Sequence, residues 1–136
     1  MYRIERRPWG VWLAFSGRMS DGEIQDWMRE SREVLEEIPR PFSVVVDLRA
    51  LSPLVPEVQF LLVEGQRLYR ERGMVRSAVL LEGPIVLRQF QRIAEQSGIR
   101  DGERYIDASR HPDPEALAIA WARDGTDPDD YDPPGR

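Results

Sequence analysis

The chain has 136 residues, the length of one domain, and its net charge of −5 and its composition exclude several kinds of chemistry. Because it has no Cys, it cannot form disulfides, use a thiolate nucleophile or hold a Cys-ligated zinc or iron–sulfur site. All 19 basic residues are Arg, which excludes Schiff-base and P-loop lysines and is typical of a bacterial genome rich in G and C.

Charge and hydropathy indicate how the chain meets its surroundings. The segment from Asp124 onward contains five acidic residues and one basic residue, Arg136, so this tail carries −4 and the rest of the chain −1. A nearly neutral body argues against a nucleic-acid partner. No apolar run approaches the about 18 residues that span a bilayer, and the N-terminus lacks the apolar segment of a signal peptide. We therefore expect a cytoplasmic protein without membrane insertion.

Hydrophobic periodicity predicts nine elements in chain order. Tyr2 to Arg7 alternates apolar and charged side chains, and the apolar run after Pro8-Trp9-Gly10 completes a β-hairpin. Ser20 and Glu23 have the spacing of a capping box and begin the first helix. Prolines bound the β-branched run 42–48, which is typical of a central strand covered on both faces. Strands are expected at 2–7, 11–16, 42–48, 77–81 and 104–107, and helices at 20–38, 57–72, 84–97 and 114–123.

The order β-β-α-β-α-β-α-β-α predicts an α/β fold, with a mainly parallel mixed sheet and an N-terminal antiparallel hairpin. Gly65 lies within the apolar stripe of the second helix, which favours a close approach of that helix to the sheet. Residues 1–123 form the expected single domain. Residues 124–136 combine Gly, Pro and Asp without periodicity, so we expect a disordered acidic tail.

The loop from Arg49 to Pro56 is the first candidate for a binding surface. Its prolines stiffen a connector that carries the apolar side chains of Leu51, Leu54 and Val55, and stiff apolar loops bind with little ordering cost. The same side chains also suit a place in the core, so both alternatives stay open.

Two tryptophans form a second candidate surface. In the strand 11–16, alternation places Trp12 on the face opposite Val11, Leu13 and Phe15, which is also the face of the hairpin's charged residues. Trp9 lies beside it in the hairpin turn. An exposed Trp flanked by Arg is typical of a protein-binding hot spot. The alternative is that helices cover both faces of the sheet and Trp12 belongs to the core.

Several short motifs, in order and spacing, resemble the STAS family over residues 2–122. The similar segments are the turn Phe-Ser-Gly-Arg-Met-Ser at 15–20, the strand Val-Val-Val-Asp-Leu at 44–48, the junction Arg-Glu-Arg-Gly at 70–73 and the helix Pro-Glu-Ala-Leu at 114–117. Residues 47–51 and Trp121 also resemble the SpoIIAA-like branch. The resemblance implies the fold of bacterial anti-sigma-factor antagonists, with an anti-sigma factor, a kinase-like protein or a second copy as partner.

The chain departs from this family at its regulatory motif. Regulated antagonists carry Asp-Ser-Ser-Gly at the start of the second helix, where a serine is phosphorylated, whereas the corresponding residues here are Val55-Pro56-Glu57-Val58. The resemblance therefore implies partner binding without the usual phosphoserine switch. The charge of Glu57 either imitates a phosphate or only complements the helix dipole. Ser52 is a second possible site of modification, although a turn hydroxyl is its commoner use.

We therefore expect a non-enzymatic regulatory or scaffold domain that binds a protein through Leu51, Ser52, Leu54, Val55 and Glu57, or through Trp9 and Trp12. The alternative is a small-molecule or lipid-binding module, with an apolar ligand between the sheet and the second helix. Phe60 and Val63 lie off the apolar stripe of that helix and need cover from a ligand, a subunit or a neighbouring helix. The single His111 lies in a loop without a nucleophile motif, so no catalysis, metal or cofactor is expected.

Overall fold

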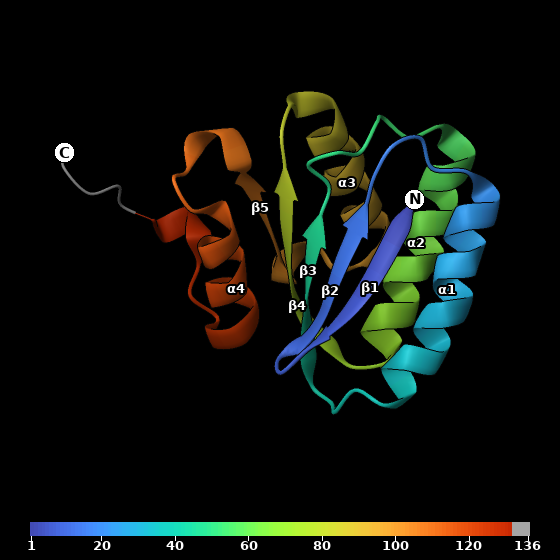
Figure 1. The fold of residues 1–136 in the computed structure, drawn as a ribbon, viewed down its shortest axis with the longest axis horizontal. Helices are drawn as coiled ribbons and strands as arrows, with labels where there is room; N and C mark the ends of the chain where they lie inside the picture. Colours follow the sequence, from blue (N-terminus) through green and yellow to red (C-terminus); the bar gives the residue numbers. More distant parts are fainter. Residues whose placement is uncertain (132–136) are drawn as a thin grey trace.

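The computed structural model describes residues 1–131, which form five strands and four α-helices (Figure 1). Most elements begin or end within one to three residues of the predicted positions. The strands are β1 (Tyr2–Arg7), β2 (Gly10–Phe15), β3 (Phe42–Asp47), β4 (Met74–Leu81) and β5 (Glu103–Asp107). The helices are α1 (Asp21–Glu36), α2 (Pro56–Glu71), α3 (Pro84–Ser97) and α4 (Pro114–Asp124).

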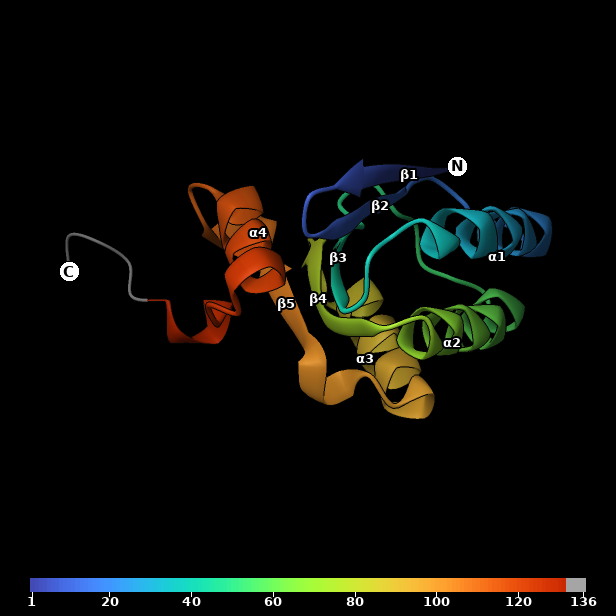
Figure 2. The same ribbon diagram turned by 90° about the horizontal axis from the view of Figure 1, so that it is seen from below.

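The strands lie in the sheet in chain order, β1-β2-β3-β4-β5. β1 pairs antiparallel with β2, and every other neighbouring pair is parallel. Each helical crossover advances by one strand in the same direction, so crossovers of one hand place α1, α2 and α3 on the same face. Figure 2 shows these three helices on one side of the sheet and α4 on the other. The predicted α/β fold class is confirmed.

Local signals set several element boundaries. The Ser20 hydroxyl accepts a hydrogen bond from the Glu23 N–H, and the Glu23 side chain accepts one from the Ser20 N–H, which completes the predicted capping box. Pro84 occupies the first turn of α3, and Gly98 ends that helix at φ 86°, a left-handed conformation that favours glycine. These positions explain why the bounds of α1 and α3 follow the sequence closely.

Alternating strand residues divide the core into two layers. In β3, Val44 and Val46 pack toward α1, α2 and α3, whereas Val45 packs toward α4. In β4, Val79 belongs to the larger layer and Leu80 to the smaller one. Because helices cover both faces of β3 and β4, their sequences read as continuous apolar runs.

Gly65 permits a contact that differs from the expected one. A Cβ atom at this position would lie 2.2 Å from Cζ3 of Trp27, a residue of α1. The missing side chain therefore makes room for an indole from the neighbouring helix. The sequence predicted that Gly65 would bring α2 close to the sheet, but the glycine faces α1 instead. The Trp27 ring also stacks on Tyr69, with centroids 5.4 Å apart, so aromatic packing joins α1 and α2.

The first residues of the acidic tail are ordered against the domain. Both carboxylate oxygens of Asp127 accept hydrogen bonds from Nε of Arg104, at 3.0 and 3.1 Å, and Pro128 is buried. The Tyr131 ring meets the His111 ring edge to face at 5.2 Å. Residues 124–131 therefore differ from the expected disordered tail, because the charge of Asp127 is paired and Pro128 is buried. Residues 132–136 lie outside the described part of the chain.

Candidate functional site

One edge of the molecule collects the carboxyl ends of the parallel strands and the N-termini of α1, α2 and α3. This apical edge lies at the top of Figure 1. The loop that joins β3 to α2 crosses it and is tied to the turn before α1, since Gly17 N–H donates to Ala50 at 2.9 Å and Ser52 N–H donates to Gly17 at 3.0 Å. Open α/β sheets bind ligands most often at this end of their strands.

Two of the predicted loop anchors are buried. Leu51 is 9 % exposed and Leu54 is 6 % exposed, and both belong to the larger core layer. Leu51 is held by the backbone bridge to Gly17, and the side chain of Leu54 points into the core just before α2 begins. The expectation that these leucines contact a partner is therefore corrected, and the core alternative describes them.

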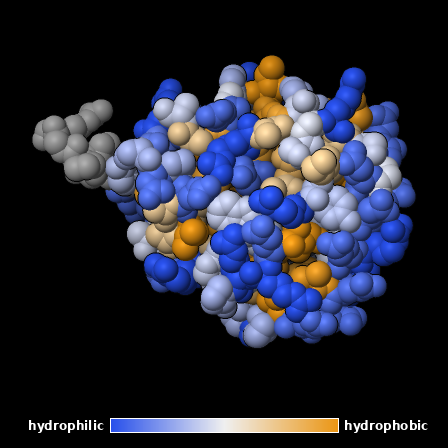
Figure 3. Space-filling view, viewed as in Figure 1, coloured by the Kyte–Doolittle hydropathy of each residue, from blue (hydrophilic) through white to orange (hydrophobic). Residues whose placement is uncertain are grey.

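The remaining loop residues face solvent next to an exposed aromatic side chain. Ser52, Val55 and Glu57 are exposed, with Val55 at 40 %, and Phe60 on the first half of α2 is 67 % exposed. Glu57 and Phe60 border an open groove of about 440 Å³ between α1 and α2, lined by Asp21, Gln25, Pro56, Glu57, Phe60 and Leu61. We call Val55, Glu57 and Phe60 the apical surface. Figure 3 shows that the face viewed in Figure 1 is otherwise mainly hydrophilic, with hydrophobic atoms in scattered places that include this edge.

Phe60 and Val63, which both lie off the apolar stripe of α2, have different surroundings. Val63 is 5 % exposed and packs in the core, so a neighbouring part of the chain supplies its cover. Among the described residues 1–131, nothing covers Phe60 in this way. Ile85 at the start of α3 is also exposed, at 61 %, and sequence reasoning missed it. The same test would have found it, because Ile85 lies outside the buried stripe of Val86, Phe90 and Ile93.

The tryptophan candidates are placed against α4. Trp12 is 5 % exposed in the smaller core layer, with the guanidinium carbon of Arg7 4.9 Å from its ring centroid. Trp9 is partly buried against the same layer. The expectation of an exposed hot spot at Trp12 is corrected, because α4 and Arg7 cover the face of β2 that the hairpin's charges had indicated as open.

An ion-paired network joins the start of the loop to α4. The Arg49 guanidinium donates to Asp47 at 2.8 and 3.0 Å and to Glu115 at 2.7 Å. Burial would raise the pKa of Asp47, but its hydrogen bonds from Arg49 outweigh burial and hold that pKa below its ordinary value. The motif Asp-Leu-Arg at 47–49 therefore fixes the direction in which the chain leaves β3.

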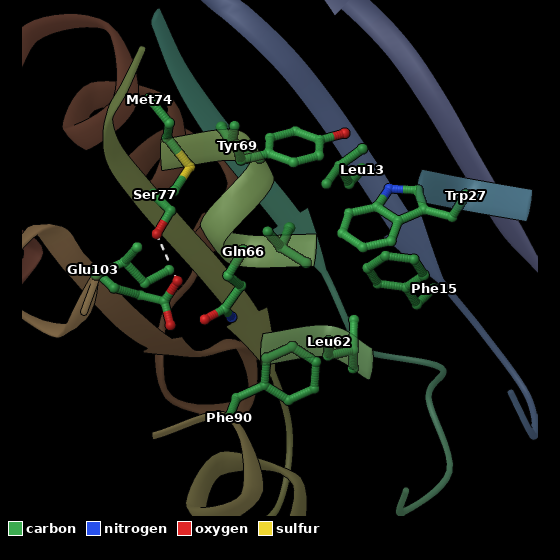
Figure 4. A pocket seen from close by; sticks show the side chains of 13 residues that line it. Leu13, Phe15, Trp27, Leu62, Gln66, Tyr69, Met74, Ser77, Phe90 and Glu103 are labelled. Atoms are coloured by element: carbon green, nitrogen blue, oxygen red, sulfur yellow. Dashed lines mark hydrogen bonds between the residues drawn. The ribbon is translucent and has the colours of Figure 1, made fainter. Parts of the chain in front are cut away.

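A small cavity lies between the sheet and α2, where the alternative prediction placed an apolar ligand. Its volume is about 30 Å³, and thirteen side chains line it, ten of which are labelled in Figure 4. Trp27 and Phe15 lie at one end and Ser77 and Glu103 at the other. A buried water needs about 10–15 Å³, whereas ligand pockets commonly measure about 300–1,000 Å³. The cavity thus has the size of a water site, which disfavours a bound lipid in this arrangement of the core.

The polar end of the cavity holds a buried carboxyl group. Glu103 is 1 % exposed and accepts hydrogen bonds from the hydroxyls of Ser77 at 2.5 Å and Tyr105 at 2.6 Å. Burial raises the pKa of Glu103 to about 7, although the hydrogen bonds from Ser77 and Tyr105 and the charge of Arg100 act in the opposite direction. Both carboxyl oxygens have hydroxyl partners, so a structural role accounts for this group.

Comparison with solved structures identifies the fold. A protein of the DUF3478 family from Shewanella loihica PV-4, described as having a SpoIIAA-like fold, superposes with a TM-score of 0.60 at 18 % identity, covering 90 % of this chain and 92 % of that one. The anti-sigma factor antagonist SpoIIAA in its unphosphorylated form superposes with a TM-score of 0.56 at 12 % identity, covering 85 % and 96 %. The chain therefore has a SpoIIAA-like fold, as the STAS resemblance implied.

Comparisons at the sequence level find no similar family. No family model matches the chain, and no curated protein sequence matches it. Within residues 1–131, no helix combines the length and apolar character needed to cross a bilayer.

Proposed function

We propose that this chain is a non-enzymatic regulatory domain that binds a protein partner through its apical surface. The observation that carries the proposal is the 67 % exposure of Phe60, a large aromatic side chain that lines an open groove together with Glu57. Aromatic residues, Phe among them, are enriched at protein interfaces relative to the rest of the surface. The SpoIIAA-like fold supports a protein as partner, since a solved structure with this fold is that of an anti-sigma factor antagonist.

The proposed binding is constitutive. Val55, the N-cap residue of α2, makes no side-chain hydrogen bond to the helix, and Pro56 follows it in the first turn. The segment 55–58 offers no hydroxyl for phosphorylation, so a phosphate cannot repel a partner from this part of the surface. Glu57 places a permanent negative charge there instead, which complements the helix dipole. Phosphorylation within 55–58 would therefore not release a partner anti-sigma factor or kinase-like protein.

The test compares two aspartate substitutions at exposed apolar side chains. Phe60→Asp alters the apical surface, whereas Val75→Asp alters a side chain that is 50 % exposed near the start of β4, at the opposite end of the strands. Each immobilised variant is incubated with a lysate of the source organism, and bound proteins are identified by mass spectrometry. The principal captured protein is then purified and titrated against each variant by calorimetry.

We expect Phe60→Asp to weaken binding of the purified partner by about tenfold or more, as loss of an interface hot spot does. Val75→Asp should leave the affinity within about twofold, and circular dichroism should show both variants folded. Equal affinities for wild type and Phe60→Asp would contradict the proposal. Analytical ultracentrifugation of the same three proteins shows whether the partner is a second copy of this chain.

A further inference from the structure

One side chain of α3 holds the loop that precedes α2. Nε2 of Gln89 donates to the carbonyl of Leu54 at 3.0 Å, and Oε1 of Gln89 accepts from the N–H of the same residue at 2.9 Å. A primary amide carries both a donor and an acceptor, so it can satisfy both backbone groups of one residue. Gln59 adds a second donor to the Leu54 carbonyl at 3.0 Å. Gln89 therefore pairs with Leu54 as a neighbouring strand would.

This pairing lies directly before the residue that starts α2. The Val55 carbonyl accepts from Val58 and Gln59 N–H, both at 3.1 Å, but the Val55 side chain makes no cap hydrogen bond. With no side-chain cap, the first turn of α2 takes its direction from the backbone of the loop. The Gln89 amide fixes that backbone, and the buried Leu54 side chain fixes it from the other side.

The clamp also determines where the exposed side chains of the apical surface lie. Val55 follows Leu54 immediately, and Glu57 lies in the first turn of α2. Ile85 precedes Gln89 by one helical turn, so the side chain of Gln89 leaves α3 on the same face as Ile85. Gln89 thus joins α3 to the loop residue that precedes the start of α2.

We propose that Gln89 is a positioning residue: its amide holds the loop 49–55 in the arrangement that a protein partner binds, without contacting that partner itself. The proposal rests on the proposed function of the apical surface. An ordered loop binds with less loss of conformational entropy than a mobile one. Loss of the clamp should therefore weaken binding while the exposed side chains remain unchanged.

Three substitutions separate the two hydrogen bonds. Gln89→Met keeps a side chain of similar length but can neither donate nor accept strongly, whereas Gln89→Glu can accept from the Leu54 N–H but cannot donate to its carbonyl at pH 7.5. Gln59→Met removes one donor from the carbonyl and leaves both Gln89 hydrogen bonds in place. It is the control for a general loss of polar groups near the loop.

The first measurement needs no partner. Hydrogen exchange followed by NMR reports local opening at the Leu54 amide, and exchange of core amides in β3 and β4 reports global unfolding. We expect Gln89→Met to exchange the Leu54 amide at least about tenfold faster with unchanged β3 and β4 amides, and Gln59→Met to have a smaller effect. Unchanged exchange at Leu54 in Gln89→Met would overturn the proposal.

The second measurement is the affinity for the purified protein that wild type captures and Phe60→Asp loses. We expect Gln89→Met to bind it about 5- to 30-fold more weakly, with an unchanged melting temperature, and Gln89→Glu to lie at or beyond that value because its carboxylate repels the Leu54 carbonyl. Faster exchange with unchanged affinity would overturn the positioning role. If wild type captures no protein, the proposed function fails and the positioning role with it, while the exchange rates still show whether Gln89 orders the loop.

Discussion

At the scale of single residues, the fold shifts the pKa of Glu103 and so changes the pH at which its carboxyl group is charged. It begins β5, where its carboxyl group accepts hydrogen bonds from Ser77 and Tyr105 beside the apolar cavity, and the charge of Arg100 acts on it. The ordinary pKa of a glutamate is about 4.5, whereas burial raises the pKa of Glu103 to about 7. Over the interval between these values the folded protein keeps a proton that the unfolded chain has lost.

This difference makes stability depend on pH in a defined direction. The stabilising contribution of protonated Glu103 is fully present below the unfolded pKa near 4.5 and is lost progressively as the pH rises through about 7. Glu103→Gln stays neutral throughout, so the stability of wild type relative to this variant should fall by about 2 to 3 kcal/mol between pH 5 and pH 8. Urea denaturation at both pH values measures the difference. Parallel pH dependences of the two proteins would show that Glu103 is ionised in the folded state already at pH 5.

At the scale of elements, the contact between α1 and α2 depends on the absence of one side chain. Trp27 fills the space over Gly65, stacks on Tyr69 and meets the Phe15 ring at 81°. Gly65→Ala would favour the helix by about 1 kcal/mol, but its Cβ would overlap the indole, and overpacking commonly costs about 1–3 kcal/mol. The indole lies between rings from β2 and α2, so it has little freedom to move away. We expect a net loss of stability in this variant.

The matched control is Gly22→Ala in the first turn of α1. A Cβ atom there would meet only Oγ of Ser20, at 4.0 Å, so the substitution should be neutral or stabilising by up to about 1 kcal/mol. Thermal denaturation of both variants gives the sign. A stability gain in Gly65→Ala equal to that in Gly22→Ala would mean that Trp27 moves aside without cost.

Element boundaries followed from the sequence where a local signal decides them. The capping box at Ser20 and the pair of Pro84 and Gly98 are such signals, and the predicted helices begin or end close to these positions. β4 begins at Met74 rather than Ser77, because its first residues pair with β3, a contact between distant segments. Periodicity shows that a face is apolar but not what covers it.

The candidate site was predicted less completely for the same reason. The position of the loop and the absence of a serine at 55–58 follow from local sequence, whereas the exposure of Val55 comes from the structure. Leu51 and Leu54 lie in a loop, which has no periodicity to indicate their side-chain direction. The exposure of Trp12 depends on whether a helix covers the second face of the sheet, and only the packing of α4 decides this. The Gln89 clamp joins residues 35 positions apart and has no sequence signal of its own.

At the scale of the whole molecule, the segment after α4 folds back against α4 and β5. Arg104 on β5 lies with its guanidinium carbon 4.4 Å from the Trp121 ring centroid and is bonded to Asp127, so strand, helix and tail meet at one side chain. The hydrogen bond from the Asp129 N–H and the pair with Arg104 hold the pKa of Asp127 below its ordinary value. Within residues 124–131, the segment therefore contributes the paired charge of Asp127 and the buried Pro128.

A chain that ends at Thr126 should lose the contacts of Asp127 and Pro128. It should keep α4, because the N–H groups of Gly125 and Thr126 still donate hydrogen bonds to the last turn of that helix. We expect its melting temperature to fall by roughly 3 to 6 °C, since Pro128 is no longer buried and Arg104 loses its carboxylate. A chain that ends at Tyr131 is the matched control, since it retains Asp127, Pro128 and the contact of Tyr131 with His111. Asp127→Asn should reproduce part of the shift, whereas Asp130→Asn, at an exposed position, should not. Equal melting temperatures for the chains ending at Thr126 and Tyr131 would show that the segment adds nothing to stability and that its contacts form only because it is tethered.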